Sequence, residues 1–248
     1  MNLLLVEPHE LQDGRIDLDG PRAEHLLRVL RVEVGARVRA GVVDGGTGLA
    51  EVVAVEGARL TLSLETGPTP PRPRVDLILA LPRPKVLGRL YAMLAQLGVD
   101  RVLLTHAAKV ERFYFDAHQL APEWRRVHLL EGLAQAKDTR LPRVTEHRSL
   151  TRLLTRELDP LVDRQAGPRL LAHPGGLRSV HAAASGQRPD ARVLLAIGPE
   201  GGWTDDEHAL FVSHGFEEVS LGARTLRTDT ATIGLLCLVH DALGPALP

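Results

Sequence analysis

Two loops near the C-terminal end carry the residues whose types and spacing could do chemistry. The first, Gly198-Pro199-Glu200-Gly201-Gly202, follows an apolar run that ends at Ile197. The second, from Leu221 to Thr230, has the sequence LGARTLRTDT and holds two arginines, a carboxylate and several hydroxyl groups. Each loop is predicted to join a strand to a helix, and open α/β sheets bind small ligands where such loops meet. The sequence therefore predicts a small-molecule site that these two loops share.

The residues around the first loop restrict the kind of ligand. Its glycines allow the backbone to approach a ligand closely. The following Thr204-Asp205-Asp206-Glu207 predicts a helix start with a capping box between Thr204 and Glu207. Three carboxylates at that start disfavour a bound phosphate, and the fingerprints of P-loop and dinucleotide-binding proteins do not occur in the sequence. A neutral or cationic ligand such as S-adenosylmethionine fits better, and an ordinary glycine-rich turn is the structural alternative.

Alternating strands and helices must position these loops. Apolar periodicity predicts helices over 85–98 and about 122–137, and strands over the runs 75–81, 101–105, 169–173, 192–198 and 217–221. Such alternation is typical of a mostly parallel sheet with helices on both faces. Thr228 or Asp229 is expected to cap the terminal helix. Cys237 lies in an apolar run of that helix and is expected to be a small core residue.

A proline-rich segment, Pro68 to Pro73, predicts a border between two domains, because such dense prolines form a stiff extended connector. The first domain is expected to span 1–70 and the second, α/β domain 71–248. Short alternating runs around one helical segment precede the border, and a strong hairpin signal occurs at Asp44–Gly48. This pattern predicts a small β-barrel.

Composition bounds the possible partners and the compartment. The chain has 248 residues, a net charge of -1, 3% aromatic residues and one cysteine. A neutral chain has no global field for nucleic acid, so RNA binding would need a local basic patch. The lone thiol cannot form an internal disulfide, which favours a cytoplasmic setting. No signal peptide and no apolar stretch of membrane-spanning length are recognised, so no membrane partner is expected.

The two loops together resemble the signature of the ribosomal RNA small subunit methyltransferase E family, through IGPEGGWTDDE at 197–207 and LGARTLRTDTA at 221–231. HLLRVLRVEVG at 25–35, LALPRPK at 79–85, QLGVDRV at 96–102 and TRLP at 139–142 are also similar to family segments, so the resemblance covers nearly the whole chain. It implies an α/β SPOUT domain with a trefoil knot, an N-terminal PUA-like barrel and a homodimer. The implied activity is methylation of N3 of a uridine in small-subunit ribosomal RNA, with S-adenosylmethionine as cofactor.

The resemblance, together with the position of the two loops, implies which residues bind the cofactor, take part in catalysis and bind RNA. Cofactor contacts are expected from Leu171, Ala172, His173, Ile197, Gly198, Glu200, Gly201, Gly202, Leu221, Gly222, Leu226, Thr228 and Thr230. Deprotonated uracil spreads its charge onto O2 and O4, so we assign Arg227 to stabilise that charge and Glu200 or Asp229 to accept the proton. RNA contacts are expected from His25, Arg28, Arg31 and Arg224, with Arg125, Arg126, Lys137 and Arg140 as an extension. No metal site is expected.

Some segments depart from the family's usual pattern, and these departures leave the identity of the RNA target open. Gln96 stands in the place of a usual glutamate, 135–140 differs from the usual segment before the proline, and the last loop reads Thr228-Asp229-Thr230. The substrate is therefore expected to be small-subunit ribosomal RNA, naked or in the assembled subunit. The alternatives are another RNA or another atom, or a non-catalytic RNA-binding assembly factor.

Overall fold

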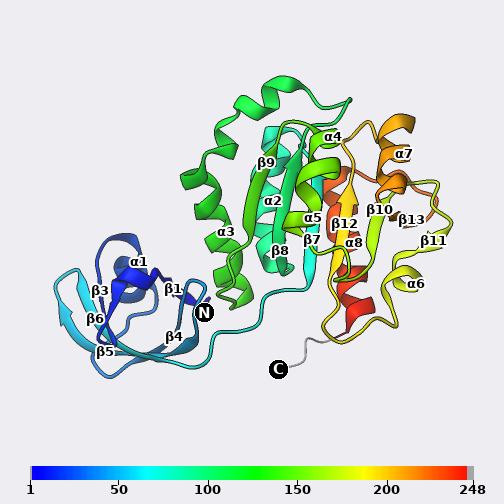
Figure 1. Ribbon diagram of the computed structural model, residues 1–248. Coiled ribbons are helices and arrows are strands. Elements are labelled where there is room, and N and C mark those ends of the chain that lie inside the picture. Colours follow the sequence, from blue (N-terminus) through cyan, green and yellow to red (C-terminus); the bar gives the residue numbers. More distant parts are fainter. Residues whose placement is uncertain (1, 245–248) are drawn as a thin grey trace. The chain divides into compact units, whose positions relative to one another are not determined.

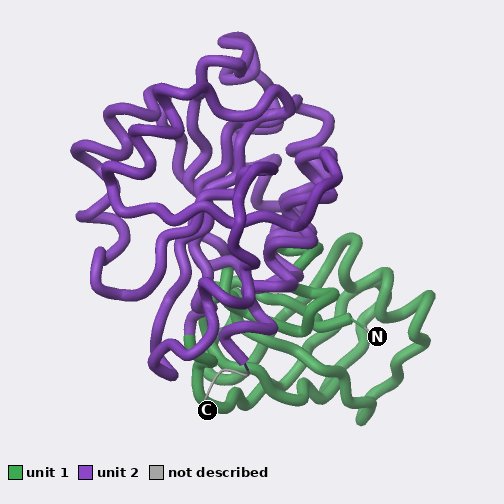
Figure 2. Tube along the Cα trace, turned by 90° about the vertical axis from the view of Figure 1, so that its right-hand side faces the viewer, with its two compact units in different colours: residues 1–71, 130–141 green, residues 72–129, 142–248 purple. Residues whose placement is uncertain are grey.

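The computed structural model describes residues 2–244 and divides the chain into two compact units (Figures 1 and 2). The first comprises Met1–Pro71 and Leu130–Leu141, and the second comprises Arg72–Leu129 and Pro142–Pro248. The segment 130–141 thus groups with the N-terminal unit, although a linear division of the sequence assigns it to the C-terminal one. Helix α3 (Pro122–Ala136) contains the point where the chain passes from one unit to the other.

The first unit is built on a mixed six-stranded sheet. Its strand order is β1-β4-β5-β6-β3-β2, in which β1 pairs parallel with β4 and the other neighbours are antiparallel. The strands are β1 (Leu4–Val6), β2 (Leu11–Gln12), β3 (Arg15–Leu18), β4 (Arg37–Val42), β5 (Thr47–Glu56) and β6 (Arg59–Thr66). Between β3 and β4, helix α1 (Gly20–Glu24) continues into a π-helical turn over His25–Val29.

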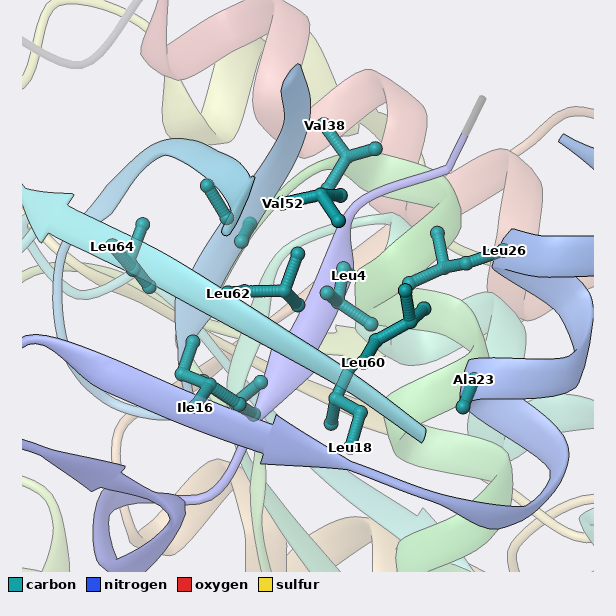
Figure 3. Close-up of a cluster of buried hydrophobic side chains, with 13 residues drawn as sticks. Leu4, Ile16, Leu18, Ala23, Leu26, Val38, Val52, Leu60, Leu62 and Leu64 are labelled. Atoms are coloured by element: carbon teal, nitrogen blue, oxygen red, sulfur yellow. The ribbon is translucent and has the colours of Figure 1, made fainter. Parts of the chain in front are cut away.

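The core of this unit follows the two-residue alternation of its strands. Leu60, Leu62 and Leu64 on β6 are all buried, with polar residues between them. Figure 3 shows these leucines among the buried side chains of the neighbouring strands and of α1. The segment 130–141 packs on the β4–β5 hairpin, because Thr139 donates to the Gly45 carbonyl at 2.6 Å and its own carbonyl accepts from the Asp44 amide at 2.8 Å.

The second unit holds a seven-stranded sheet in which every pairing is parallel, in the order β11-β13-β10-β12-β7-β8-β9. The strands are β7 (Val75–Ala80), β8 (Val99–Thr105), β9 (Arg143–His147), β10 (Arg169–Ala172), β11 (Arg178–Ser179), β12 (Val193–Ile197) and β13 (Phe216–Ser220). Besides α3, the helices are α2 (Pro84–Gln96), α4 (Leu150–Arg152), α5 (Leu158–Leu161), α6 (Val180–Ala184), α7 (Asp205–Ser213) and α8 (Thr228–Leu243). Helices α2 and α8 pack on each other and on the central strands (Figure 1).

A buried ionic cluster fixes the beginnings of the central strands. Asp76 at the start of β7 accepts two hydrogen bonds from Arg192, at 3.1 and 2.7 Å, just before β12. Asp100 in β8 accepts from Arg192 at 2.8 Å and from Arg72 at 2.9 Å. Burial raises the pKa of Asp76, and the bonds from Arg192 counteract this. The cluster therefore ties β7, β8 and β12 together at the edge opposite the glycine-rich loops.

The strands predicted from apolar runs are present, and the parallel sheet is as expected. Strand β9 and the short helices α4 and α5 were not expected, whereas helical sequence was expected after β10, where α6 lies. Cys237 corrects another prediction, because its side chain is exposed rather than in the core. Within residues 2–244, no helix combines the length and apolar character needed to cross a membrane.

Candidate functional site

A cavity of about 250 Å³ lies where β10, β12 and β13 end. Its wall consists of the segments 172–174, 197–203, 219–222 and 224–226, completed by Thr228, Ala231 and Leu235 of α8. These segments are the carboxyl-end connections of neighbouring parallel strands, because β10 pairs with both β12 and β13. The two loops singled out in the sequence therefore form one cavity, at the edge of the sheet where α/β folds bind ligands.

The shape of the first loop depends on a glycine facing a tryptophan. A Cβ at position 198 would lie 3.1 Å from Nε1 of Trp203, so the indole can approach only because Gly198 has no side chain. Gly202 adopts a φ of +70° and closes the loop through a bond from its amide to the Pro199 carbonyl at 2.8 Å. The Trp203 side chain is 7% exposed, and its buried Nε1 finds no hydrogen-bond partner within residues 2–244. The indole N–H is thus a buried donor next to the cavity, unpaired among the described residues.

The segment after β8 holds the first loop from outside. Nζ of Lys109 donates to the Gly201 carbonyl at 2.8 Å, and the Ala108 amide donates to Oε1 of Glu207 at 2.7 Å. Glu207 also completes the predicted capping box, since its Oε2 accepts from the Thr204 amide at 2.9 Å while its own amide donates to Oγ1 of Thr204 at 3.3 Å. Glu207 therefore joins the start of α7 to the segment after β8, a connection that local sequence rules do not reveal.

The second loop reaches the cavity before α8 begins. Oγ of Ser220 accepts from the Gly222 amide at 3.0 Å and donates to the Gly222 carbonyl at 3.2 Å, which folds the chain tightly after β13. Arg224 lies on the cavity wall. The expected cap by Thr228 or Asp229 is wrong: α8 starts at Thr228, and its N-cap residue is Arg227, which makes no capping bond through its side chain.

The candidate catalytic groups occupy different positions. Glu200 lines the cavity, and its Oε1 accepts a long 3.5 Å bond from the Arg83 amide. Asp229 and Arg227 are not part of the cavity wall. The Asp229 carboxylate lies 3.3 Å from NH2 of Arg89 and 3.6 Å from Nε of Arg227, whose side chain is 74% exposed. Asp229 is therefore an ion-paired carboxylate between two arginines, and Glu200 is the carboxylate that faces the cavity.

Most of the residues expected to bind the cofactor line the cavity: Ala172, His173, Ile197, Gly198, Glu200, Gly201, Gly202, Leu221, Gly222, Leu226 and Thr228. Two do not, because Leu171 is fully buried inside β10 and Thr230 is exposed on α8 away from the wall. The sequence reasoning missed Pro174, Pro199, Trp203, Val219, Ser220, Thr225, Ala231 and Leu235. Trp203 directly follows the glycines of the motif, which was the available signal.

The residues expected to bind RNA differ in their exposure and in the contacts that their side chains make within the protein. His25 and Arg31 are exposed on the first unit, and the 79%-exposed Arg28 forms an i,i+4 pair with Glu24 at 2.8 Å. Two members of the suggested extension are bound internally. Arg125 pairs with Glu146 at 2.8 Å, and Nε of Arg140 donates to the Pro70 carbonyl at 2.6 Å. These two arginines therefore stabilise their own units.

The two units correspond to an RNA methyltransferase domain and an accessory PUA domain. Residues 69–240 match the model of the RNA methyltransferase domain, and residues 18–65 match that of the RNA methyltransferase PUA domain. The chain belongs to the ribosomal RNA small subunit methyltransferase E family. It is 32% identical to the family member of Treponema pallidum, over 96% of this chain and 90% of the relative, and 29% identical to that of Synechocystis, over 97% of this chain and 77% of the relative.

Solved structures confirm the α/β fold with its N-terminal PUA-like unit. The ribosomal RNA small subunit methyltransferase E of Neisseria gonorrhoeae, bound to S-adenosylmethionine, superposes with a TM-score of 0.76 at 21% identity, covering 96% of this chain and 95% of that one. A probable rRNA methyltransferase of Porphyromonas gingivalis has a TM-score of 0.75 at 24% identity, with 98% of each chain covered. The threading of the C-terminal segment through a knot stays a prediction.

Proposed function

We propose that this protein uses S-adenosylmethionine to methylate N3 of a uridine in small-subunit ribosomal RNA, and that it acts as a homodimer. The observation that carries the proposal is the single cavity formed by the Gly198–Gly202 loop and the Leu221–Leu226 segment at the strand ends. Membership of the family and the naming of its relatives as ribosomal RNA methyltransferases support the RNA class.

The wall of the cavity suits S-adenosylmethionine chemically. Ile197, Leu226 and Leu235 present apolar surface for an adenine ring, and the Trp203 side chain adds to the wall. Glu200 supplies negative charge beside the cavity, which favours a sulfonium and opposes a phosphate. When bound there, S-adenosylmethionine supplies a methyl group on a positively charged sulfur. The protein must then prepare the RNA nitrogen that receives it.

Uridine N3 carries a proton that it must lose before it becomes a nucleophile. Glu200 is our candidate to accept this proton, because it is the carboxylate on the cavity wall. The resulting anion is shared by O2 and O4, and a guanidinium beside them would stabilise it. We assign this role to Arg227, and we assign to Asp229 the positioning of Arg227 through their 3.6 Å pair. Arg224, on the wall, is placed to hold an RNA phosphate.

RNA binding by the first unit is proposed to use His25, Arg28 and Arg31. They are exposed and lie on the π-helical turn or directly after it. Guanidinium contacts to phosphates release counterions, so RNA affinity should fall steeply with salt. Replacing Arg28 and Arg31 together with alanine should weaken RNA binding uniformly and reduce the salt dependence, while S-adenosylmethionine affinity stays unchanged.

The decisive test is methyl transfer from labelled S-adenosylmethionine to small ribosomal subunits prepared from a strain that lacks this gene. Nucleoside mass spectrometry identifies the product, and naked small-subunit RNA in a parallel reaction distinguishes the two substrate forms. The expected product is 3-methyluridine. Another methylated nucleoside would move the reaction to a different atom. Cofactor binding without transfer would point to another RNA, and absence of cofactor binding would favour a non-catalytic assembly factor.

A further inference from the structure

Two histidines and a glutamate from three different elements meet at the edge of the cavity. His173 directly follows β10, His208 lies in α7 and Glu218 lies in β13. Oε1 of Glu218 is 2.8 Å from Nε2 of His208, and Oε2 is 3.5 Å from Nδ1 of His173. One ligand atom from each residue lies within 4.8 Å of the others, and across residues 2–244 this is the one such group of three.

Hydrogen bonds do not account for this convergence. Nδ1 of His173 accepts a bond from the Gly175 amide at 3.2 Å, so in the neutral ring this nitrogen carries a lone pair and cannot donate to Glu218. Nε2 of His208 is buried and makes no hydrogen bond of acceptable geometry, although Oε1 of Glu218 is only 2.8 Å away. Three electron-rich groups therefore face one another, and a cation bound at Nδ1 of His173 would replace the long bond from the Gly175 amide. Such an arrangement is stabilised when a cation shares their lone pairs.

The types and spacing of the donor atoms indicate which cation fits. Imidazole nitrogens suit zinc and its transition-metal neighbours, whereas magnesium and calcium prefer oxygen ligands alone. Zinc bonds of about 2.0–2.2 Å in a tetrahedron separate neighbouring ligand atoms by roughly 3.4 Å. The separations here are 2.8 Å from Oε1 of Glu218 to His208 and 3.5 Å from Oε2 of Glu218 to His173, so the two carboxylate oxygens lie on either side of that value. We propose that His173, His208 and Glu218 bind a Zn²⁺ ion, with water as the fourth ligand.

A zinc ion at this position would hold together elements that form part of the cavity wall. The three side chains are between 26% and 40% exposed, so an ion can enter from solvent. His173 also lines the cavity. A bound ion would fasten α7 to β10 and β13 and hold this part of the cavity wall. The site does not depend on methyl transfer, and its test needs neither RNA nor S-adenosylmethionine.

Isothermal titration of the full-length, tag-free protein with ZnCl₂, after chelator treatment, tests the proposal. We expect one ion per chain, a higher melting temperature with zinc, and a visible absorption spectrum typical of tetrahedral Co²⁺ when cobalt replaces zinc. His208→Ala and the isosteric Glu218→Gln should each weaken zinc binding at least about a hundredfold, because loss of a direct ligand exceeds the usual effect of losing an outer partner.

His214→Ala is the matched control, because this histidine immediately follows α7 and its Nδ1 lies 2.8 Å from the Leu210 carbonyl, outside the cluster. It should bind zinc like the unaltered protein. Equal zinc affinity in all four proteins would mean adventitious binding elsewhere and would overturn the proposal. So would absence of zinc binding by the unaltered protein. Circular dichroism establishes that each variant is folded.

Discussion

At the scale of single residues, the cavity depends on the contact between Gly198 and Trp203. A Cβ on residue 198 would lie 3.1 Å from Nε1 and 3.2 Å from Cε2 of the indole. The indole is buried and also packs on Phe211, with ring centroids 4.8 Å apart, so it has little room to retreat. The methyl group must therefore displace either the loop or the ring that lines the cavity.

Gly198→Ala should lower S-adenosylmethionine affinity by about 5- to 150-fold, which corresponds to an overpacking cost of about 1–3 kcal/mol. Isothermal titration calorimetry measures the change. Gly67→Ala is the control, because its Cβ would meet nothing closer than the Thr47 carbonyl at 3.6 Å. If both variants bind the cofactor like the unaltered protein, the Gly198 loop does not form the cofactor site.

Replacing Arg227 should affect methyl transfer rather than cofactor binding, because this residue lies outside the cavity wall and its side chain is 74% exposed. If it stabilises charge on the uracil during transfer, Arg227→Ala should reduce kcat about a hundredfold, in the range found for loss of one such donor. S-adenosylmethionine affinity should change little. Single-turnover methyl transfer and cofactor titration separate the two effects, and Arg188→Ala serves as an exposed-arginine control. Equal losses in turnover and cofactor affinity would assign Arg227 to cofactor binding instead.

At this scale the sequence predicts only those features that depend on residues close to one another in the chain. The capping box of Thr204 and Glu207 involves residues three apart, and the structure confirms it. The exposure of Cys237 and the contact between Lys109 and Gly201 depend on where distant segments come to lie. No local rule contains that information.

At the scale of elements, the packing of α8 on α2 includes a partly buried histidine. The ring of His240 lies beside Gly98, where its Cε1 is 3.7 Å from the position of a Cβ. Burial lowers the pKa of His240 below its usual 6.5, Arg74 adds to this effect, and a hydrogen bond to the backbone of Leu97 partly offsets it. The folded protein therefore keeps this ring neutral at a pH where the unfolded chain already protonates it.

His240 should make stability depend on pH in the mildly acidic range. A lowered pKa in the folded state contributes stability that is fully present above the unfolded pKa of 6.5 and is lost as pH falls through the folded pKa. Urea unfolding from pH 7.5 down to pH 5 should show a decrease that is smaller in His240→Gln. His181→Gln provides the comparison, since that side chain is 60% exposed. Identical pH profiles for His240→Gln and the unaltered protein would contradict the assignment.

A strand of the sheet could be predicted where its burial requires a continuous run of apolar residues in the sequence. Strand β7 is buried along its whole length and reads as a continuous apolar run. Strand β9, at the edge of the same sheet, has no fully buried residue and reads as RVTEH, so its sequence lacks an apolar run. The strand order results from pairings between distant segments, and the ionic cluster of Asp76, Asp100 and Arg192 that accompanies it cannot be inferred locally.

At the scale of the whole molecule, the sequence motifs indicated the family and its two-part architecture. They did not show that 130–141 belongs with the N-terminal unit. Bonds from Thr139 and Arg140 to Gly45 and Pro70 make that connection, between segments about which the sequence gives no pairing signal. Helix α3 consequently contributes residues to both units. The proposed homodimer is the remaining property of the molecule as a whole.

An apolar face on α8 is our candidate for the dimer interface. Leu238 is 37% exposed, and Cys237 beside it is exposed as well. Apolar side chains grouped on the surface of one helix are typical of surfaces that another protein covers. A charge placed there would have to be buried without a partner, which opposes association.

Leu238→Glu should therefore convert the dimer to a monomer at micromolar concentrations, as measured by sedimentation velocity. Val212→Glu, on α7 of the same unit and 49% exposed, is the matched control and should leave association unchanged. The single cysteine adds a second readout, because a dimer through this face would cover Cys237. Its reaction with a thiol reagent should accelerate in Leu238→Glu and on dilution of the unaltered protein. A dimer that persists in Leu238→Glu, with Cys237 reacting equally fast in both proteins, would place the interface on another surface.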